Sequence, residues 1–322
     1  MEILPGVHRL SFRHRDRWLY VYLLVGDWLV LVDTGTAAVP EEVILPALHS
    51  LGIDPARRPF LALNTHADAD HSGGNGELRL ACPQALLLCH DRDRSHIEDH
   101  ERLWRERYTG YLTPHGLAYP PGLTQKMRAS MGRAVPVDLV LTGGETIRIR
   151  SDWELRILFT PGHTPGHVAV HDLRHRTAYI GDAALGRGIP AAEGDCLALP
   201  PSYEDVEAYA GTARALRSLD LDILCPSHFP LLRAEAIPRF LDETEDWIAR
   251  TDEAILATLR EVRAPIGMKA LIAAVTKPLG GWPEEPALTL AMSLTAHLER
   301  LERLGQITRL PDERPPAWEL RS

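Results

Sequence analysis

A short run of histidine and aspartate residues constrains this chain more than any other feature. Residues 64–75 read NTHADADHSGGN and follow an apolar stretch, FLALN at 60–64, that predicts a buried strand. Imidazole nitrogen and carboxylate oxygen are the usual protein ligands of zinc, manganese and iron(II). The run therefore predicts a metal site at the end of a strand. Four potential ligands lie within six residues: His66, Asp68, Asp70 and His71.

Three later segments repeat the same arrangement, in which a histidine or aspartate follows an apolar strand. They are FTPGHTPGH at 159–167, YIGDA at 179–183 and LCPSH at 224–228. An isolated histidine would mean little, but these repeated strand-end positions predict that His163, Asp182 and His228 join the first four residues in one site. His167 is expected to be structural.

The rest of the chain to about residue 232 alternates short apolar strands with helical stretches, which is typical of an α/β fold. Residues 18–33 begin it with two apolar runs joined at Gly26-Asp27, a tight hairpin turn. Residues 91–145 differ, being polar, helix-prone and interrupted by prolines, and we expect them to form a helical insertion or cap over a pocket. Packing among the inserted helices is the alternative role for its aromatic side chains. The candidate pocket residues are Trp104, Tyr108, Tyr111 and His115.

The last ninety residues are mostly helical. We expect a linking helix at 233–252 and a separate module at 253–322, with three helices followed by paired strands at 306–310 and 317–320. This is the outline of a winged-helix domain. Residues 253–322 carry nine basic and nine acidic side chains, so a DNA-reading face is not expected. Packing or homodimer formation is the expected role.

The ordered motifs resemble those of the metallo-β-lactamase-fold superfamily of metallohydrolases, in particular its hydroxyacylglutathione-hydrolase-like members with a winged-helix-like tail. The resemblance covers residues 1–232 and implies a four-layer αββα sandwich as the catalytic domain. It implies that Asp33, in LVDTG, supports the metal loop, although a plain turn carboxylate is the alternative. It also implies two divalent metal ions, bridged by Asp182, held by His66, Asp68, Asp70, His71, His163 and His228.

One position departs from the family pattern, because the HxHxDH loop reads HxDxDH here and Asp68 stands where a histidine is usual. If Asp68 binds metal, site one is His66, Asp68 and His163, and site two is Asp70, His71 and His228. A harder oxygen ligand could move the preference from zinc, the expected metal, toward manganese or iron(II). Aspartate is also shorter than histidine, so Asp68 could fail to reach the ion.

The reaction implied by the resemblance is hydrolysis by a metal-bound hydroxide, with Asp70 or a bound water protonating the leaving group and Asp182 completing the catalytic set. No GxSxG motif or GxxxxGK[ST] loop supports another chemistry. The expected substrate is a small ester, lactone or thioester. A phosphodiesterase, phosphotriesterase or nuclease on the same metal site is the alternative, and a metal-containing DNA-binding regulator is a weaker one.

The composition of the chain restricts which binding partners and which cellular location we expect for the protein. The net charge of −9 argues against a non-specific nucleic-acid binder. No stretch of 18 apolar residues predicts a membrane span, and the first residues lack the apolar core of a signal peptide. We therefore expect a cytoplasmic enzyme acting on a small molecule. The four cysteines form no CxxC motif, so neither a thiolate zinc site nor a disulfide framework is indicated: Cys82, Cys89, Cys196 and Cys225.

Overall fold

The structure is a computed structural model that describes residues 1–310 and 315–321. Its first sheet has seven strands in sequence order. Neighbouring strands are antiparallel from β1 to β4 and parallel from β4 to β7. The strands are β1 (Glu2–Leu4), β2 (Val7–His14), β3 (Arg17–Val25), β4 (Leu29–Val32), β5 (Phe60–Leu63), β6 (Leu86–His90) and β7 (Leu139–Leu141).

The second sheet has six strands in the order β15-β14-β11-β10-β9-β8. Strands β11 and β14 run parallel, and the other neighbours are antiparallel. The strands are β8 (Thr146–Arg150), β9 (Trp153–Phe159), β10 (Val168–Asp172), β11 (Thr177–Gly181), β14 (Ile223–Pro226) and β15 (Leu232–Arg233). A separate pair, β12 (Ile189–Pro190) and β13 (Leu197–Leu199), lies between β11 and α7 in the chain.

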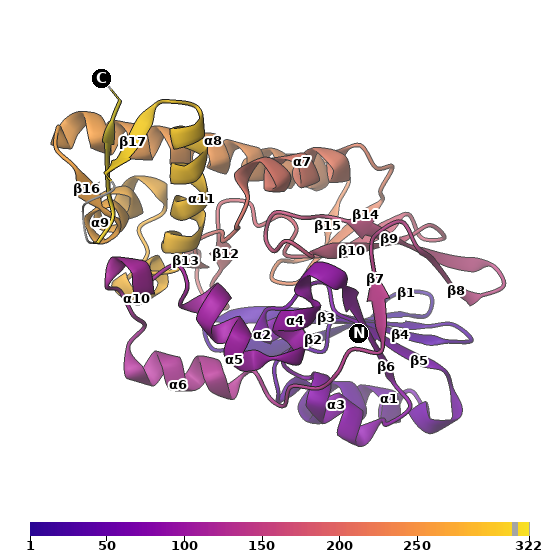
Figure 1. Cartoon of the computed structure of the whole chain (residues 1–322). Coiled ribbons are helices and arrows are strands. Elements are labelled where there is room, and N and C mark those ends of the chain that lie inside the picture. The colour runs from indigo at the N-terminus through magenta and orange to yellow at the C-terminus, as the bar shows by residue number, and fades with distance from the viewer. Residues whose placement is uncertain (311–314, 322) are drawn as a thin grey trace.

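The two sheets pack face to face, with helices on both outer faces (Figure 1). Strand β4 shows why: Val30 and Val32 pack between the sheets, whereas Leu29 and Leu31 face the outer helices. The first sheet is covered by α1 (Leu45–Ser50) and α3 (Asn75–Ala81), and the second by α7 (Val206–Arg217) and α8 (Ala236–Val262). The predicted four-layer sandwich is confirmed.

The segment between β6 and β8 is mainly helical and lies beside the sandwich (Figure 1). It also contains β7, an edge strand of the first sheet, so the range 91–145 is not helical throughout. Its helices and turns are α4 (Asp91–Glu98), α5 (His100–Leu103), the π-helical turn η3 (Trp104–Tyr108), η4 (Thr113–His115) and α6 (Pro121–Ala129). Residues 91–129 are called the cap segment below. Short helices elsewhere are η1 (Pro40–Ile44), η2 (Pro55–Arg57) and α2 (Ala69–Ser72).

The C-terminal part begins on α8, one helix of 27 residues that runs through the predicted boundary at 252/253. The expected strand pairing is present, because β17 (Ile307–Leu310) pairs with β18 (Ala317–Leu320), which also pairs with β16 (Ile266–Gly267). The remaining helices are α9 (Met268–Leu279), α10 (Glu284–Ala287) and α11 (Leu290–Arg303). Its description as a winged helix stays a prediction.

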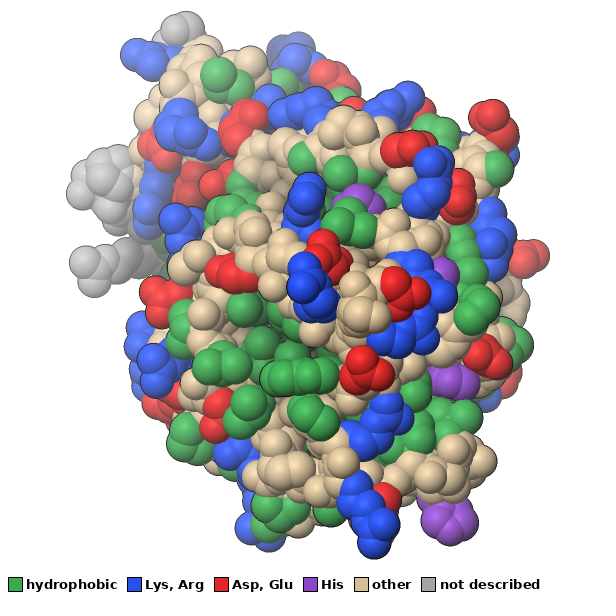
Figure 2. Space-filling model, turned by 90° about the vertical axis from the view of Figure 1, so that its right-hand side faces the viewer, with side chains coloured by type: hydrophobic (Ala, Val, Ile, Leu, Met, Phe, Trp, Pro, Cys, Tyr) green, Lys and Arg blue, Asp and Glu red, His purple; other side chains and the backbone are tan. Residues whose placement is uncertain are grey.

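The helices of the chain are short or amphipathic relative to a membrane span. Over the residues that the structure describes, none is sufficiently long and apolar to cross a bilayer. On the face shown in Figure 2, basic and acidic side chains are interspersed and do not separate into areas of one sign.

Candidate metal centre

Seven side chains predicted to bind metal come together at the ends of strands from both sheets. His66 to His71 follow β5, His163 follows β9, Asp182 follows β11 and His228 follows β14. Within each of three overlapping groups, the candidate ligand atoms lie within 4.8 Å of one another. The groups are His66, Asp68 and His163; His66, His71 and Asp182; and Asp70, His71 and His228.

Asp33 orients two of these histidines. Its Oδ2 accepts hydrogen bonds from His71 Nδ1 at 2.8 Å and from the Thr65 hydroxyl at 2.9 Å. Because that hydroxyl proton is used on Asp33, the Thr65 oxygen accepts from His66 Nδ1 at 3.0 Å. With Nδ1 held in this way, both rings direct Nε2 toward the centre, the atom through which such a ring would bind a metal. This is the supporting position that the resemblance implied for Asp33.

The other histidines are fixed in the same way. Nδ1 of His228 donates to the Trp18 carbonyl at 3.0 Å, and Nδ1 of His163 donates to the Ser202 carbonyl at 2.6 Å. His167 turns its Nε2 to the Asp182 backbone N–H, which donates to it at 3.1 Å. His167 therefore has the structural position expected for it, supporting the segment that carries Asp182.

Two buried atoms at this centre have no protein partner among the described residues. They are His71 Nε2 and Asp182 Oδ1, which lie 3.6 Å apart. Buried polar atoms are nearly always hydrogen-bonded, so an unpartnered nitrogen beside an unpartnered carboxylate oxygen fits a bound cation. Burial opposes ionisation of Asp182, but the nearby His228 and His71 outweigh it and hold its pKa well below its usual range. The donor set thus fits a divalent metal here.

Asp68 has a different environment, because it forms a two-pronged ion pair with Arg107. Arg107 Nε lies 2.5 Å from Asp68 Oδ1, and Nη2 lies 2.7 Å from Oδ2. Burial disfavours the Asp68 carboxylate, but Arg107 keeps its pKa well below the ordinary value. Asp70 makes a single arginine contact within residues 1–310 and 315–321, between its Oδ2 and Arg17 Nη2 at 3.2 Å. We call His66, Asp68 and His163 the Arg107 half of the centre, and Asp70, His71 and His228 the open half.

The sequence interpretation missed two residues that hold the centre together. Asp93 is fully buried and accepts hydrogen bonds from Ala67 N, Thr164 Oγ1 and Gly166 N. It thereby ties the metal loop to the segment that carries His163. Its position just after an apolar strand was an available signal, since the other site residues share it. Arg107 carried no such signal, because it lies within the polar cap segment.

A cavity of about 720 Å³ adjoins the centre. The cap segment supplies one wall, and the predicted pocket residues Tyr108 and Tyr111 line it. Tyr108 also accepts a hydrogen bond from Ala69 N at 2.8 Å, within the metal loop. The other two predicted residues are absent from the lining: Trp104 packs against Tyr108 and Tyr119, and His115 packs against Trp318. Trp104 therefore packs within the inserted segment, the alternative considered for it, whereas His115 packs against β18 of the C-terminal part.

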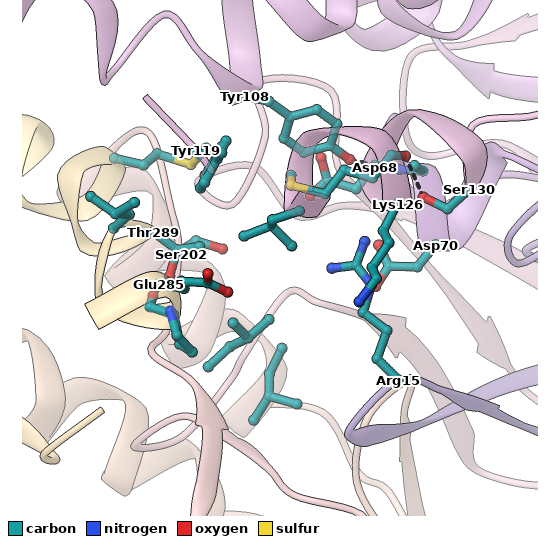
Figure 3. A pocket seen from close by; sticks show the side chains of 18 of the residues that line it. Arg15, Asp68, Asp70, Tyr108, Tyr119, Lys126, Ser130, Ser202, Glu285 and Thr289 are labelled. Carbon is teal, nitrogen blue, oxygen red and sulfur yellow. Dashed lines mark hydrogen bonds between the residues drawn. The ribbon is translucent and has the colours of Figure 1, made fainter. Parts of the chain in front are cut away.

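The C-terminal part supplies a second wall of the cavity, which the sequence did not predict. Glu285, Leu288, Thr289 and Met292 line it. Figure 3 shows Tyr119, Ser202, Glu285 and Thr289 on one side, across from Asp70, Lys126 and Arg15. The cavity thus has an end formed with the C-terminal helices and a second end that carries basic side chains.

Comparison with known proteins agrees with this geometry. The model of the metallo-beta-lactamase superfamily matches residues 19–228, which include the whole ligand set. The chain belongs to this superfamily. A metallo-beta-lactamase family protein from Thermus thermophilus superposes with a TM-score of 0.74 at 22% identity, over 99% of this chain and 100% of that one. The likeness extends over the C-terminal part as well as the sandwich.

Two curated relatives of this superfamily member are named as hydrolases. Human acyl-coenzyme A thioesterase MBLAC2 is 28% identical over 228 residues, which are 65% of this chain and 72% of that one. A hydroxyacylglutathione hydrolase from Synechococcus sp. (strain JA-3-3Ab) is 28% identical over 174 residues, 52% of this chain and 50% of that one. The chain is accordingly a superfamily hydrolase, as predicted.

Proposed function

We propose that this chain is a metal-dependent thioesterase that acts on a substrate with an apolar acyl part and an anionic thiol part. One observation carries the proposal: the metal-ligand cluster forms part of the wall of a cavity whose ends differ in chemistry. The names of the two curated relatives, both hydrolases of thioesters, support the choice of a thioester over an oxygen ester or lactone.

The basic end of the cavity is suited to an anionic group. Arg15 and Lys126 line it, and neither forms an ion pair with another side chain in the described part of the chain. Both are therefore available to a carboxylate or phosphate of the thiol part. The end that Figure 3 shows across from them carries Tyr119 together with the polar Ser202, Glu285 and Thr289. Apolar side chains elsewhere in the lining suit an acyl group: Ile189, Leu199, Leu288 and Met292.

The residues of the metal centre have different roles in the proposed hydrolysis. A divalent ion bound by the cluster would supply Lewis acidity, which activates water and polarises a carbonyl. Asp33 holds the His71 ring so that its Nε2 lone pair faces the centre. Asp70 lies on the cavity wall with an ionised carboxylate, since burial is outweighed by His71 and Arg17 and its pKa is lowered. Its position lets it accept a hydrogen bond from an attacking water and so orient that water, while its lowered pKa keeps the carboxylate ionised.

Hydrolysis rates test the proposal directly. Enzyme loaded separately with zinc, manganese or iron(II) is given an acyl-coenzyme A ester, an uncharged thioester of the same acyl chain, a lactone and an aryl phosphodiester. We expect the anionic thioester to be the best substrate. Lys126→Ala and Arg15→Ala should raise KM for it while leaving KM for the uncharged thioester unchanged. Arg148→Ala, on β8 at a distance from the cavity lining, is the matched control.

Two outcomes would contradict the proposal. Faster hydrolysis of the phosphodiester than of either thioester would make phosphoryl chemistry the activity of this site. Equal rates on all carboxylic substrates, with no effect of Lys126→Ala, would remove the assignment of an anionic thiol part.

A further inference from the structure

Arg107 uses its entire hydrogen-bonding capacity at the metal centre. The side chain comes from η3 in the cap segment and is 1% exposed. Nε and Nη2 bind the two oxygens of Asp68, and Nη2 also lies 3.1 Å from His163 Nε2. Nη1 donates to the His163 carbonyl at 3.1 Å and to Glu204. All five N–H groups of the guanidinium therefore have acceptors, and none is left for a substrate.

These contacts place a positively charged guanidinium against two of the three ligands of the Arg107 half. Arginine only donates hydrogen bonds, so His163 Nε2 must be the acceptor in its contact with Arg107. Its Nδ1 proton is used on the Ser202 carbonyl, which agrees with that assignment. Each Asp68 oxygen also accepts one hydrogen bond from Arg107 and keeps a second lone pair, and Oδ2 lies 3.0 Å from His163 Nε2. Arg107 therefore occupies the one lone pair of His163 Nε2 and one lone pair on each Asp68 oxygen. His66 Nε2, which lies 3.2 Å from His163 Nε2, makes no contact with Arg107.

The open half has no comparable obstacle. Arg17 makes one contact with Asp70, at 3.2 Å, and its Nε has no partner among the described residues. His71 Nε2 and Asp182 Oδ1 are unpartnered, and His228 Nε2 lies 3.5 Å from Asp182 Oδ2. Three ligands of this half, together with Asp182, thus remain available to an ion.

We propose that the Arg107 guanidinium takes the place of the second metal, so that the protein holds one divalent ion per chain, in the open half with Asp182. Asp68 is then the counter-ion of Arg107 and not a metal ligand. This explains the departure of the loop from the family pattern, because an aspartate accepts the two-pronged contact that a histidine could not make. This inference deals with the number of metal ions in the proposed thioesterase. It rests on the proposed function only to the extent that both require a bound metal.

The number of metal ions bound per chain tests the proposal of a single ion, and it can be measured without an activity assay. Full-length protein is stripped with a chelator, reloaded with zinc or cobalt(II), desalted and analysed for metal and protein. We expect about one ion per chain. Two tightly held ions would overturn the inference and leave the proposed function standing. No retained ion would overturn the metal dependence on which both proposals rest.

Two single variants locate the ion. His228→Ala, in the open half, should lose it, whereas His163→Ala, in the Arg107 half, should retain it. The reverse pattern would overturn the inference. The ligand-field spectrum of the cobalt-loaded protein gives a second readout, since the absorption bands should disappear in the first variant and persist in the second.

A double variant tests the role of Arg107 itself. Asp68→His with Arg107→Met removes the guanidinium and supplies the histidine usual in the family, so the count should rise to two. Arg17→Met is the matched control, because it removes the arginine beside Asp70, and its count should stay at one. A folded double variant that still holds one ion would overturn the role of Arg107. If it does not fold, the His163 and His228 variants decide the question.

Discussion

The two halves of the centre start from the same loop and differ in what reaches them from elsewhere in the chain. His66 and Asp68 enter one half, and Asp70 and His71 enter the other. In the first, a buried arginine from the cap segment binds the carboxylate by two contacts; in the second, Arg17 makes a single one. Ligand spacing within a motif therefore fixes where side chains converge, while residues distant in sequence decide which atoms remain free.

The largest expected effect comes from the one carboxylate shared by both halves. Asp182 Oδ2 lies 3.5 Å from His228 Nε2 and 3.9 Å from His163 Nε2, and Oδ1 lies 3.6 Å from His71 Nε2. Asp182→Ala should lower kcat/KM by more than the roughly 100-fold that loss of an outer partner of a ligand costs. It should also release metal. Near-normal rates with full metal content would show that neither half depends on this residue.

A smaller loss is expected from Asp33, the residue that orients histidines in both halves. Asp33→Asn should weaken metal binding by roughly 10- to 100-fold, because His71 loses the carboxylate that fixes its ring. Thr65→Val is the matched comparison, since it removes only the link between Asp33 and His66. If the ion lies in the open half, titration with a competing chelator should show a much smaller effect of Thr65→Val. Equal losses of metal affinity in Asp33→Asn and Thr65→Val would show that the two halves do not differ in metal binding.

A further predicted effect is a change of stability with pH after metal removal. In the metal-free chain, burial lowers the pKa of His71, but Asp182 and Asp33 outweigh it and raise that pKa to about 10. The stabilisation is complete below pH 6.5 and is lost as pH rises toward 10, with a slope of at most about 1.4 kcal/mol per pH unit. Urea unfolding of metal-free protein at pH 6.5, 8 and 9.5 should show decreasing stability.

His66, in the other half, should behave in the opposite way. Burial lowers its pKa to about 4, so its contribution to stability is present above pH 6.5 and is lost as pH falls toward 4. The metal-free protein should thus be most stable near pH 6.5 as far as these two groups decide it. A His71→Gln variant that keeps the wild-type decline at high pH would contradict the assignment.

The sequence predicted the sandwich and the convergence of the ligands because both depend on local patterns. Strand-end positions of His163, Asp182 and His228 can be read from apolar runs, and strand ends meet in an α/β fold. Arg107 could not be found in this way. Its place beside Asp68 depends on how the cap segment folds back, and nothing in its neighbours along the chain records that contact.

The same limit applies to the C-terminal part. Its helices and strand pair follow from local periodicity, but its share in the cavity wall depends on tertiary packing. Met292 shows this, since it lines the cavity and its sulfur lies 3.6 Å from Arg107 Nη1. A tail expected to pack or dimerise therefore also shapes the space beside the metal centre.

The continuous helix α8 has a consequence for how this enzyme can be divided. One end packs on the second sheet through Ile237 and Phe240, and the other joins the core of the C-terminal helices through Ile255 and Leu259. Tyr203 and Tyr209, which precede α8, lie in that same core. The two regions should therefore melt in a single cooperative transition. A truncated chain ending near residue 233 would be an exposed fragment and not a minimal catalyst.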